Sequence, residues 1–190
     1  MIKQIIALTG PIRAGKSSVL KLLEEKGYRG YKFSDLINKE IEKRGEKIQR
    51  RLQQEVGNEF RKRFGGNYWA KEILKIAKKD KSKYIVVDGI RNPDEIKYLK
   101  DRGAFIIGIN ADYKTRKKRY LTNLKISDPK SKKEFDRIEK KDRGIKEEYF
   151  GQQVSESLKL ADVVIINNWD NLDLLRKDIM DLLQKIKSAN

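Results

Sequence analysis

The sequence has no cysteine and no histidine among its 190 residues, and it has only 3 prolines. Without cysteine there are no disulfides and no thiolate chemistry, and without histidine the commonest zinc ligand and an imidazole base are missing. Any catalysis must therefore use Lys, Arg, Asp, Glu, hydroxyl groups and a hard metal ion. Phosphoryl transfer suits this limitation, because it depends on positioning and charge neutralisation and needs no strong side-chain base.

Long hydrophobic runs are also absent. The longest apolar stretches, Tyr84–Val87 and Phe105–Ile109, are far shorter than the ~20 residues that cross a bilayer. The N-terminus enters a strand-like run without the pattern of a secretory signal. We therefore expect a cytoplasmic protein that does not enter membranes, and the length predicts one domain over residues 1–190.

Positive charge is in excess: the formal net charge is +17 and the isoelectric point is about 9.8. Such a charge attracts phosphate-bearing partners, including nucleic acids. A Lys-rich, solvated surface or thermal adaptation explains the same excess. Charge alone therefore selects no function.

Short runs rich in β-branched residues predict strands at Gln4–Thr9, Tyr84–Val87, Phe105–Asn110 and Val163–Ile166, with a shorter candidate at Gly30–Phe33. Helical patterns lie between them. This alternation predicts a parallel five-stranded sheet with helices on both faces, a three-layer α/β sandwich.

Two charged stretches are too long to be simple crossovers. Residues 34–79 form a helical stretch interrupted at Gly45 and at Gly65–Gly66, and residues 125–150 contain breakers but almost no long apolar run. We interpret the first as an inserted group of helices and the second as a charged, mobile lid.

The first predicted strand is followed by Gly-Pro-Ile-Arg-Ala-Gly-Lys-Ser at residues 10–17, a full match to the P-loop pattern GxxxxGK[ST], and then by an amphipathic helix. Such a loop turns backbone N–H groups toward phosphate oxygens, and the helix N-terminus adds its dipole. Lys16 is expected to reach the β- and γ-phosphates of ATP, and Ser17 to ligate Mg²⁺. The predicted ATP-binding residues are Gly10, Ile12, Arg13, Ala14, Gly15, Lys16, Ser17 and Ser18.

The predicted strand Tyr84–Val87 ends in Asp88, as expected of the acidic Walker B residue that lies near Mg²⁺. The alternative is an aspartate that only caps the next turn. Ligands bind at the carboxyl ends of strands in such sheets, so the P-loop and Asp88 support each other.

The whole chain resembles the P-loop nucleoside and deoxynucleoside monophosphate kinases, in particular archaeal adenylate-kinase-related proteins and the kinase-like domain of some deoxycytidylate deaminases. The residues that carry the resemblance are Leu8 to Ser17, Ser34-Asp35, Gly57-Asn58 with Arg61, Asp88 to Pro93, Arg116, Arg119, Gly151 to Val154 and Ala161-Asp162. Deamination itself is excluded, because zinc deaminases need His and Cys ligands.

The resemblance implies that the helices within residues 34–79 bind the acceptor nucleotide through Ser34, Asp35 and Arg61. It also implies that Arg91, in the segment that begins at Asp88, binds the acceptor phosphate. A planar guanidinium suits this task because it binds phosphate in a bidentate way. Each position also has a structural explanation: Ser34 and Asp35 are good helix caps, and Arg61 and Arg91 suit a solvated surface.

The resemblance further implies that Arg116 and Arg119 act in catalysis with Lys16 and Asp88 by contacting ATP and the transferred phosphoryl group. Any basic helix contains such a pair, so a solvated face is the alternative. Asn38 and Asn123 occupy positions where relatives often carry arginine. The loss of these arginines either weakens catalysis or leaves the binding of phosphate to Lys125, Arg137 or Arg143.

These observations favour transfer of the ATP γ-phosphoryl group to a nucleoside or deoxynucleoside monophosphate. Dephospho-coenzyme A kinase is the nearest enzymatic alternative. An ATP-gated module that binds nucleic acid or ribosomes is an alternative of another class.

Overall fold

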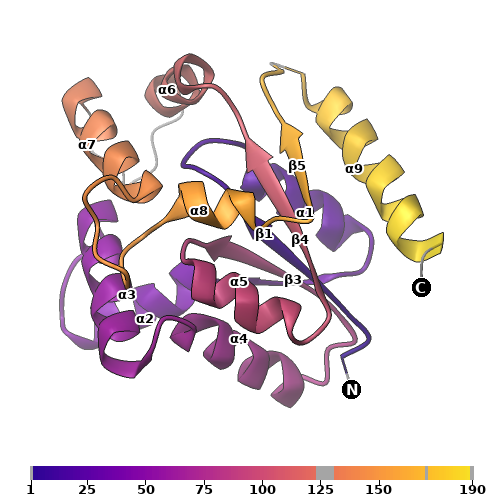
Figure 1. The fold of residues 1–190 in the computed structure, drawn as a ribbon, viewed down its shortest axis with the longest axis horizontal. Helices are drawn as coiled ribbons and strands as arrows, with labels where there is room; N and C mark the ends of the chain where they lie inside the picture. Colours follow the sequence, from indigo (N-terminus) through magenta and orange to yellow (C-terminus); the bar gives the residue numbers. More distant parts are fainter. Residues whose placement is uncertain (1, 123–130, 170, 189–190) are drawn as a thin grey trace.

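The computed structural model describes residues 2–122, 131–169 and 171–188. Its centre is a five-stranded, all-parallel sheet in the order β2-β3-β1-β4-β5 (Figure 1). The strands are β1 (Gln4–Thr9), β2 (Arg29–Lys32), β3 (Tyr84–Ile90), β4 (Ala104–Asn110) and β5 (Val163–Ile166). The predicted five-stranded parallel sheet is confirmed. Only β2 and β3 differ noticeably: β2 begins at Arg29, and β3 continues past Asp88 to Ile90.

Helices cover both faces of this sheet. Their bounds are α1 (Lys16–Glu25), α2 (Phe33–Lys43), α3 (Arg50–Phe64), α4 (Tyr68–Lys79), α5 (Pro93–Lys100), α6 (Tyr113–Thr122), α7 (Lys132–Arg143), α8 (Val154–Lys159) and α9 (Leu172–Ser188). Within the described ranges, none of these helices combines the length and apolar character needed to span a bilayer.

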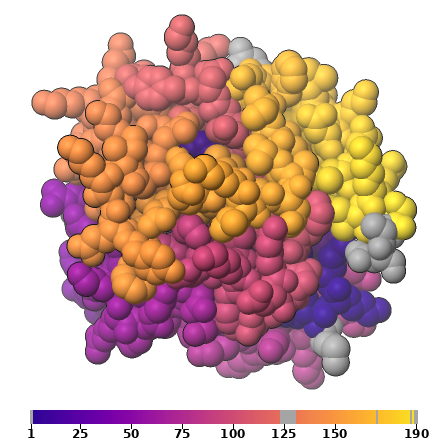
Figure 2. Space-filling model, in the orientation of Figure 1, coloured from indigo at the N-terminus to yellow at the C-terminus, as the bar shows by residue number. Residues whose placement is uncertain are grey.

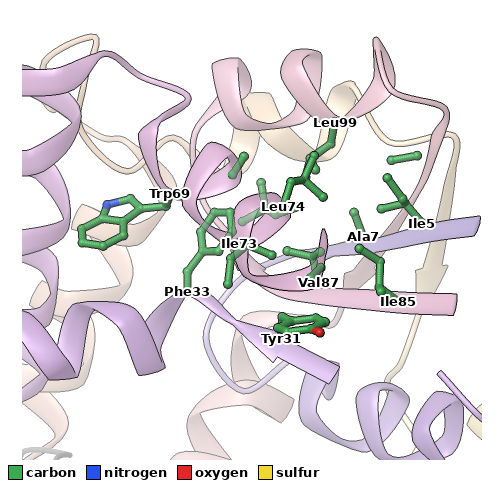
Figure 3. Close-up of a cluster of buried hydrophobic side chains, with 14 of the residues drawn as sticks. Ile5, Ala7, Tyr31, Phe33, Trp69, Ile73, Leu74, Ile85, Val87 and Leu99 are labelled. Carbon is green, nitrogen blue, oxygen red and sulfur yellow. The ribbon is translucent and has the colours of Figure 1, made fainter. Parts of the chain in front are cut away.

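The side chains of β1 point alternately to the two faces of the sheet, and this explains the three layers. Ile5 and Ala7 face a cluster that contains Phe33, Trp69 and other residues of α2, α4 and α5 (Figure 3). Ile6 and Leu8 face the opposite cluster, to which α1 and α9 contribute. Because successive side chains of a strand point to opposite faces, a continuous apolar run is buried on both sides.

The predicted inserted helices over residues 34–79 are α2, α3 and α4. The chain turns at Gly65, whose φ is 100°. Trp69 is 1% exposed and donates from Nε1 to the Gly57 carbonyl at 3.1 Å. This places Trp69 in the core, as expected of an aromatic residue at helical spacing.

Helix α7 packs beside the P-loop. Its Phe135 and Ile138 form a separate buried cluster with Ile12 and Tyr120. On the face drawn in Figure 2, little of the indigo N-terminal segment is visible between the rose and orange segments that cover it. Within the predicted lid, residues 125–130 lie outside the described residues, and the remainder is docked on the body of the protein.

Candidate functional site

The loop between β1 and α1 has a backbone that only glycine adopts readily at two places. Gly10 has a φ of 139°, and a Cβ there would lie 1.9 Å from the Ile109 carbonyl oxygen. Gly15 has a φ of 110°, and its Cβ would lie 2.2 Å from Asn167 Nδ2. Both glycines are therefore required by neighbouring segments as well as by the turn.

One cavity of about 720 Å³ joins this loop to the inserted helices. It has the size of a small-molecule site and lies at the carboxyl ends of the strands. Twelve of the predicted site residues border it: Ile12, Arg13, Gly15, Lys16, Ser17, Ser18, Ser34, Asp35, Arg61, Asp88, Arg91 and Arg119. The structure thus brings the predicted donor and acceptor residues to one space. Gly10, Ala14 and Arg116 are not on its wall.

Lys16 is the first residue of α1, and its ammonium group folds back over the loop. Nζ donates to the carbonyl oxygens of Gly10, at 2.6 Å, and Pro11, at 2.9 Å. Burial, reinforced by the positive charge of Arg91, lowers the pKa of Lys16 to about 7. A phosphate beside Lys16 would stabilise its charged form.

Asp88 lies where the ends of three neighbouring strands meet, paired in register with Leu8 on β1 and Lys32 on β2. It is 8% exposed, and its Oδ1 is buried with no hydrogen-bond partner. An unpartnered buried carboxylate oxygen is costly unless something binds it. In the part of the chain that the structure describes, no three acidic residues form a metal cage. Asp88 and the exposed Ser17 hydroxyl fit Mg²⁺, which is bound by few protein ligands plus phosphates and water.

Arg91 lies just after β3 and is mostly buried on the cavity wall. Its Nη1 donates to Asp142 Oδ1 of α7. Burial, followed by repulsion from Arg50, lowers the pKa of Arg91 to about 10. Arg91 is therefore a desolvated cation whose partner comes from α7, and not the exposed surface residue of the alternative interpretation.

Arg61 borders the cavity but is already paired. It is 1% exposed and donates to Glu95 at 2.7 Å and to Asn58 at 3.2 Å. The alternative of a solvated helix face is wrong for Arg61. Its contact with an acceptor phosphate stays a prediction.

Ser34 and Asp35 line the cavity from the first turn of α2. The N-cap of α2 is Lys32, and it makes no side-chain capping bond. The helix-cap explanation for Ser34 and Asp35 is therefore wrong, and both side chains remain available to the cavity.

The predicted arginine pair on α6 is separated. Arg119 borders the cavity and donates to the Asn167 carbonyl oxygen at 3.0 Å. Arg116 is fully buried and donates to Ala111 O at 3.0 Å and to Glu139 at 2.6 Å. Arg116 thus links α6 to Glu139 of α7 and, through a bond of 3.4 Å from Nη1 to the Ile12 carbonyl oxygen, to the P-loop. Its contact with a transferred phosphoryl group stays a prediction.

The arginines expected to compensate for Asn38 and Asn123 lie elsewhere. Arg137 forms an exposed pair with Glu134, and Arg143 donates to Glu139 at 2.5 Å. Neither borders the cavity. Asn123 and Lys125 lie outside the described residues.

Several cavity residues were not predicted from the sequence. They are mostly polar: Arg50, Gln53, Gln54, Asp142, Gln152, Asn167 and Trp169. Asn167 follows directly on β5, so the rule that ligands bind at strand ends could have found it. The residues from α3 and α7 carry no local signal, because a polar residue on an amphipathic helix is ordinarily solvated.

A phosphate-binding loop at the end of the central strand of a parallel α/β sheet, with a carboxylate on the next strand, defines a P-loop protein. Comparisons with known proteins agree. Residues 6–151 match the family model described as "AAA domain". Among curated relatives, the UPF0200 protein PH1008 of Pyrococcus horikoshii is 31% identical over 192 residues, covering 97% of this chain and 98% of that protein.

A dephospho-CoA kinase of Fusobacterium nucleatum is 30% identical over 184 residues, covering 91% of this chain and 94% of that protein. Among solved structures, shikimate kinase from Bacteroides thetaiotaomicron has a TM-score of 0.62 at 13% identity, covering 97% and 98% of the two chains. At this identity the structural likeness concerns the fold alone. The chain belongs to the AAA domain family of P-loop proteins, as a member of the P-loop nucleotide kinases. This family and fold support kinase-like phosphoryl transfer and imply that ATP binds.

Proposed function

We propose that the protein transfers the γ-phosphoryl group of ATP to a nucleoside or deoxynucleoside monophosphate. The observation that supports this best is that the P-loop shares one cavity with Ser34, Asp35 and Arg91. A donor at the P-loop and an acceptor against α2 and Arg91 would meet between them. Holding two reactants in one space is the main contribution that proteins make to this chemistry.

Lys16, Asp88, Arg91 and Arg119 each have a place in this proposal. Lys16 leaves the carbonyls of Gly10 and Pro11 to bind the donor phosphates, and Arg119 neutralises charge from the α6 side. Ser17 and Asp88 would hold Mg²⁺, which would supply positive charge against the donor phosphates. Arg91 holds the acceptor phosphate, and the surrounding helices exclude water, which strengthens every one of these interactions.

The donor base has a candidate surface as well. Trp169 and Leu172 follow β5, border the cavity that the P-loop also lines, and are 46% and 63% exposed. Arg119 Nη2 donates to the Trp169 carbonyl oxygen at 2.5 Å. An exposed apolar surface beside the phosphate site suits an adenine ring, which stacks on aromatic and guanidinium planes.

Dephospho-coenzyme A kinase activity is the second candidate, favoured by the 30% identity to the enzyme of that name over nearly the whole chain. Both candidates require an acceptor that carries phosphate. They differ in the group that attacks: a phosphate oxygen in a monophosphate kinase, and a hydroxyl in the alternative.

The deciding experiment is an ATP-consumption screen over all ribo- and deoxyribonucleoside monophosphates and dephospho-coenzyme A. We expect ADP to form only with particular monophosphates, together with one diphosphate product. ADP formation with dephospho-coenzyme A alone would select the second candidate. No acceptor-dependent ADP, with salt-sensitive RNA binding, would instead favour an ATP-gated nucleic-acid module.

A further inference from the structure

A carboxylate from α7 lies inside the phosphate-binding region. Asp142 is 1% exposed and borders the same cavity as Lys16 and Arg91. Its Oδ2 accepts a hydrogen bond from the Ile12 backbone N–H at 2.9 Å, and its Oδ1 accepts from Arg91 Nη1. Both oxygens are thus used, by a P-loop amide on one side and by the predicted acceptor arginine on the other.

These two donors are of the kind that proteins use to bind phosphate. Loop N–H groups and guanidinium groups bind phosphate and carboxylate oxygens alike, because both ligands present anionic oxygens with similar spacing. Asp142 therefore makes, within the chain, the contacts that a phosphate would make. A phosphate group close to this carboxylate would meet a like charge in a buried site, where repulsion is strong.

The anion also has a function in the unliganded site. Arg50, Arg91 and Arg119 border the cavity together with Lys16, whose pKa is already lowered to about 7. Without phosphate, Asp142 offsets part of this positive charge and so lowers the free energy of the folded protein. The same contact occupies the Ile12 N–H and the Arg91 guanidinium, two donors that suit a phosphate.

Helix α7 keeps other attachments when Asp142 is displaced. Phe135 and Ile138 pack on Ile12 and Tyr120, and Glu139 accepts from Arg116 at 2.6 Å. Asp142 is the second-last residue of α7, and the helix is followed by Gly144, its C-cap, in a left-handed conformation with a φ of 89°. These attachments lie before Asp142 in the helix, so they do not depend on the contacts of its carboxylate.

We propose that Asp142 is an internal substitute for phosphate. It occupies the Ile12 N–H and Arg91 in the unliganded protein, and phosphate-bearing ligands bind by displacing it. The affinity for phosphates is thereby reduced by the free energy of this contact, and occupancy of the P-loop is coupled to the position of the end of α7.

The test is calorimetric titration with ATP in the absence of Mg²⁺ and of any acceptor. Asp142→Asn keeps the shape and can still accept from Ile12, but it removes the charge. We expect ATP to bind about tenfold more tightly to this variant than to the wild type. Unchanged or weaker binding by the folded variant would overturn the proposal and mark Asp142 as a structural support.

Asp136→Asn is the matched control. Asp136 lies on the same helix, is 39% exposed and pairs with Lys117 at 2.9 Å, away from the cavity wall. This substitution removes the same charge, so an effect of net charge alone would appear here as well. We expect less than a twofold change, and an equal gain in both variants would refute a specific role for Asp142.

A second measurement needs no variant. Hydrogen exchange of the wild-type protein, with and without pyrophosphate as the probe, should show faster exchange of the amides at the C-terminal end of α7 when the probe is bound. Unchanged or slower exchange there, under saturating pyrophosphate, would contradict displacement. Neither measurement uses an acceptor or turnover, so their outcome is independent of the proposed kinase reaction.

Discussion

Arg61 of α3 and Glu95 of α5 form a buried ion pair, with Nε and Oε1 2.7 Å apart and side-chain exposures of 1% and 0%. The other oxygen of Glu95 accepts from the backbone N–H groups of Arg91, at 3.0 Å, and Asn92, at 3.1 Å. Glu95 therefore ties an inserted helix to the chain that carries Arg91. Because both charges are desolvated, removal of either partner should lower the free energy of unfolding substantially.

Arg61→Ala should destabilise the protein by about 3 kcal/mol or more, since it leaves Glu95 buried without its counter-ion. The measurement is the free energy of unfolding in urea. Arg51→Ala is the control on the same helix, because Arg51 is 64% exposed in its pair with Glu55, and exposed pairs contribute less than ~1 kcal/mol. Similar losses of stability in both variants would show that the buried Arg61–Glu95 pair contributes no more than an exposed pair.

The pKa of Lys16 predicts proton uptake on ATP binding. In the free protein this pKa is about 7, so at about pH 8 most Lys16 is neutral, and the phosphates recharge it. Well below pH 7 the Lys16 ammonium group is already charged, so it should take up no proton when ATP binds. Calorimetry in buffers of different ionisation enthalpy measures the effect. Lys16→Met supplies the baseline, and identical proton uptake in the variant and the wild type would refute the assignment to Lys16.

Asp88→Asn tests the inferred magnesium ligand. The buried, unpartnered Oδ1 suits a cation, so Mg²⁺ should increase the ATP affinity of the wild type more than that of the variant, by about tenfold. Without Mg²⁺ the variant should bind ATP at least as well, because it has lost a negative charge. If Mg²⁺ increases the ATP affinity of both proteins equally, Asp88 is not a ligand of the metal.

Gly15→Ala should weaken ATP binding about tenfold or more, as its Cβ would lie 2.2 Å from Asn167 Nδ2, which donates to the Ala14 carbonyl. Gly27→Ala is the control for backbone strain alone: Gly27 has a φ of 87° but open space around its Cβ position. Both variants should lose some stability. Only Gly15→Ala should lose ATP affinity, and an intact affinity would remove the need for glycine at this position.

Arg91 should separate acceptor binding from ATP binding. Arg91→Lys keeps a cation beside Asp142 but loses the planar fork, so acceptor affinity should fall about tenfold while ATP affinity changes little. Arg91→Ala should lower acceptor affinity further, by about 2 kcal/mol or more in total. Titrations with the monophosphate selected by the activity screen, and separately with ATP, decide this. Parallel losses of both affinities would identify Arg91 as structural.

Parts of the site were readable because they follow from local pattern. The P-loop is eight consecutive residues between a strand and a helix, and Asp88 ends an apolar run, so each was recognised without tertiary information. The helices over residues 34–79 were expected for the same reason. The burial of Arg61 and Arg116 in ion pairs was not expected. An arginine on a helix faces solvent or a buried partner according to which helix packs against it.

The sequence by itself determined the sheet and the phosphate-binding loop, since β-branched runs, glycines and a lysine act through the backbone conformation and hydrophobic burial of their own segments. Only the tertiary structure decided which charges meet. Asp142 reaches Ile12 across 130 residues of sequence, and Glu95 reaches Arg61 across 34. Such pairs form when packed helices bring desolvated charges together, because a buried charge is stable only beside a partner. The local sequence pattern does not identify that partner.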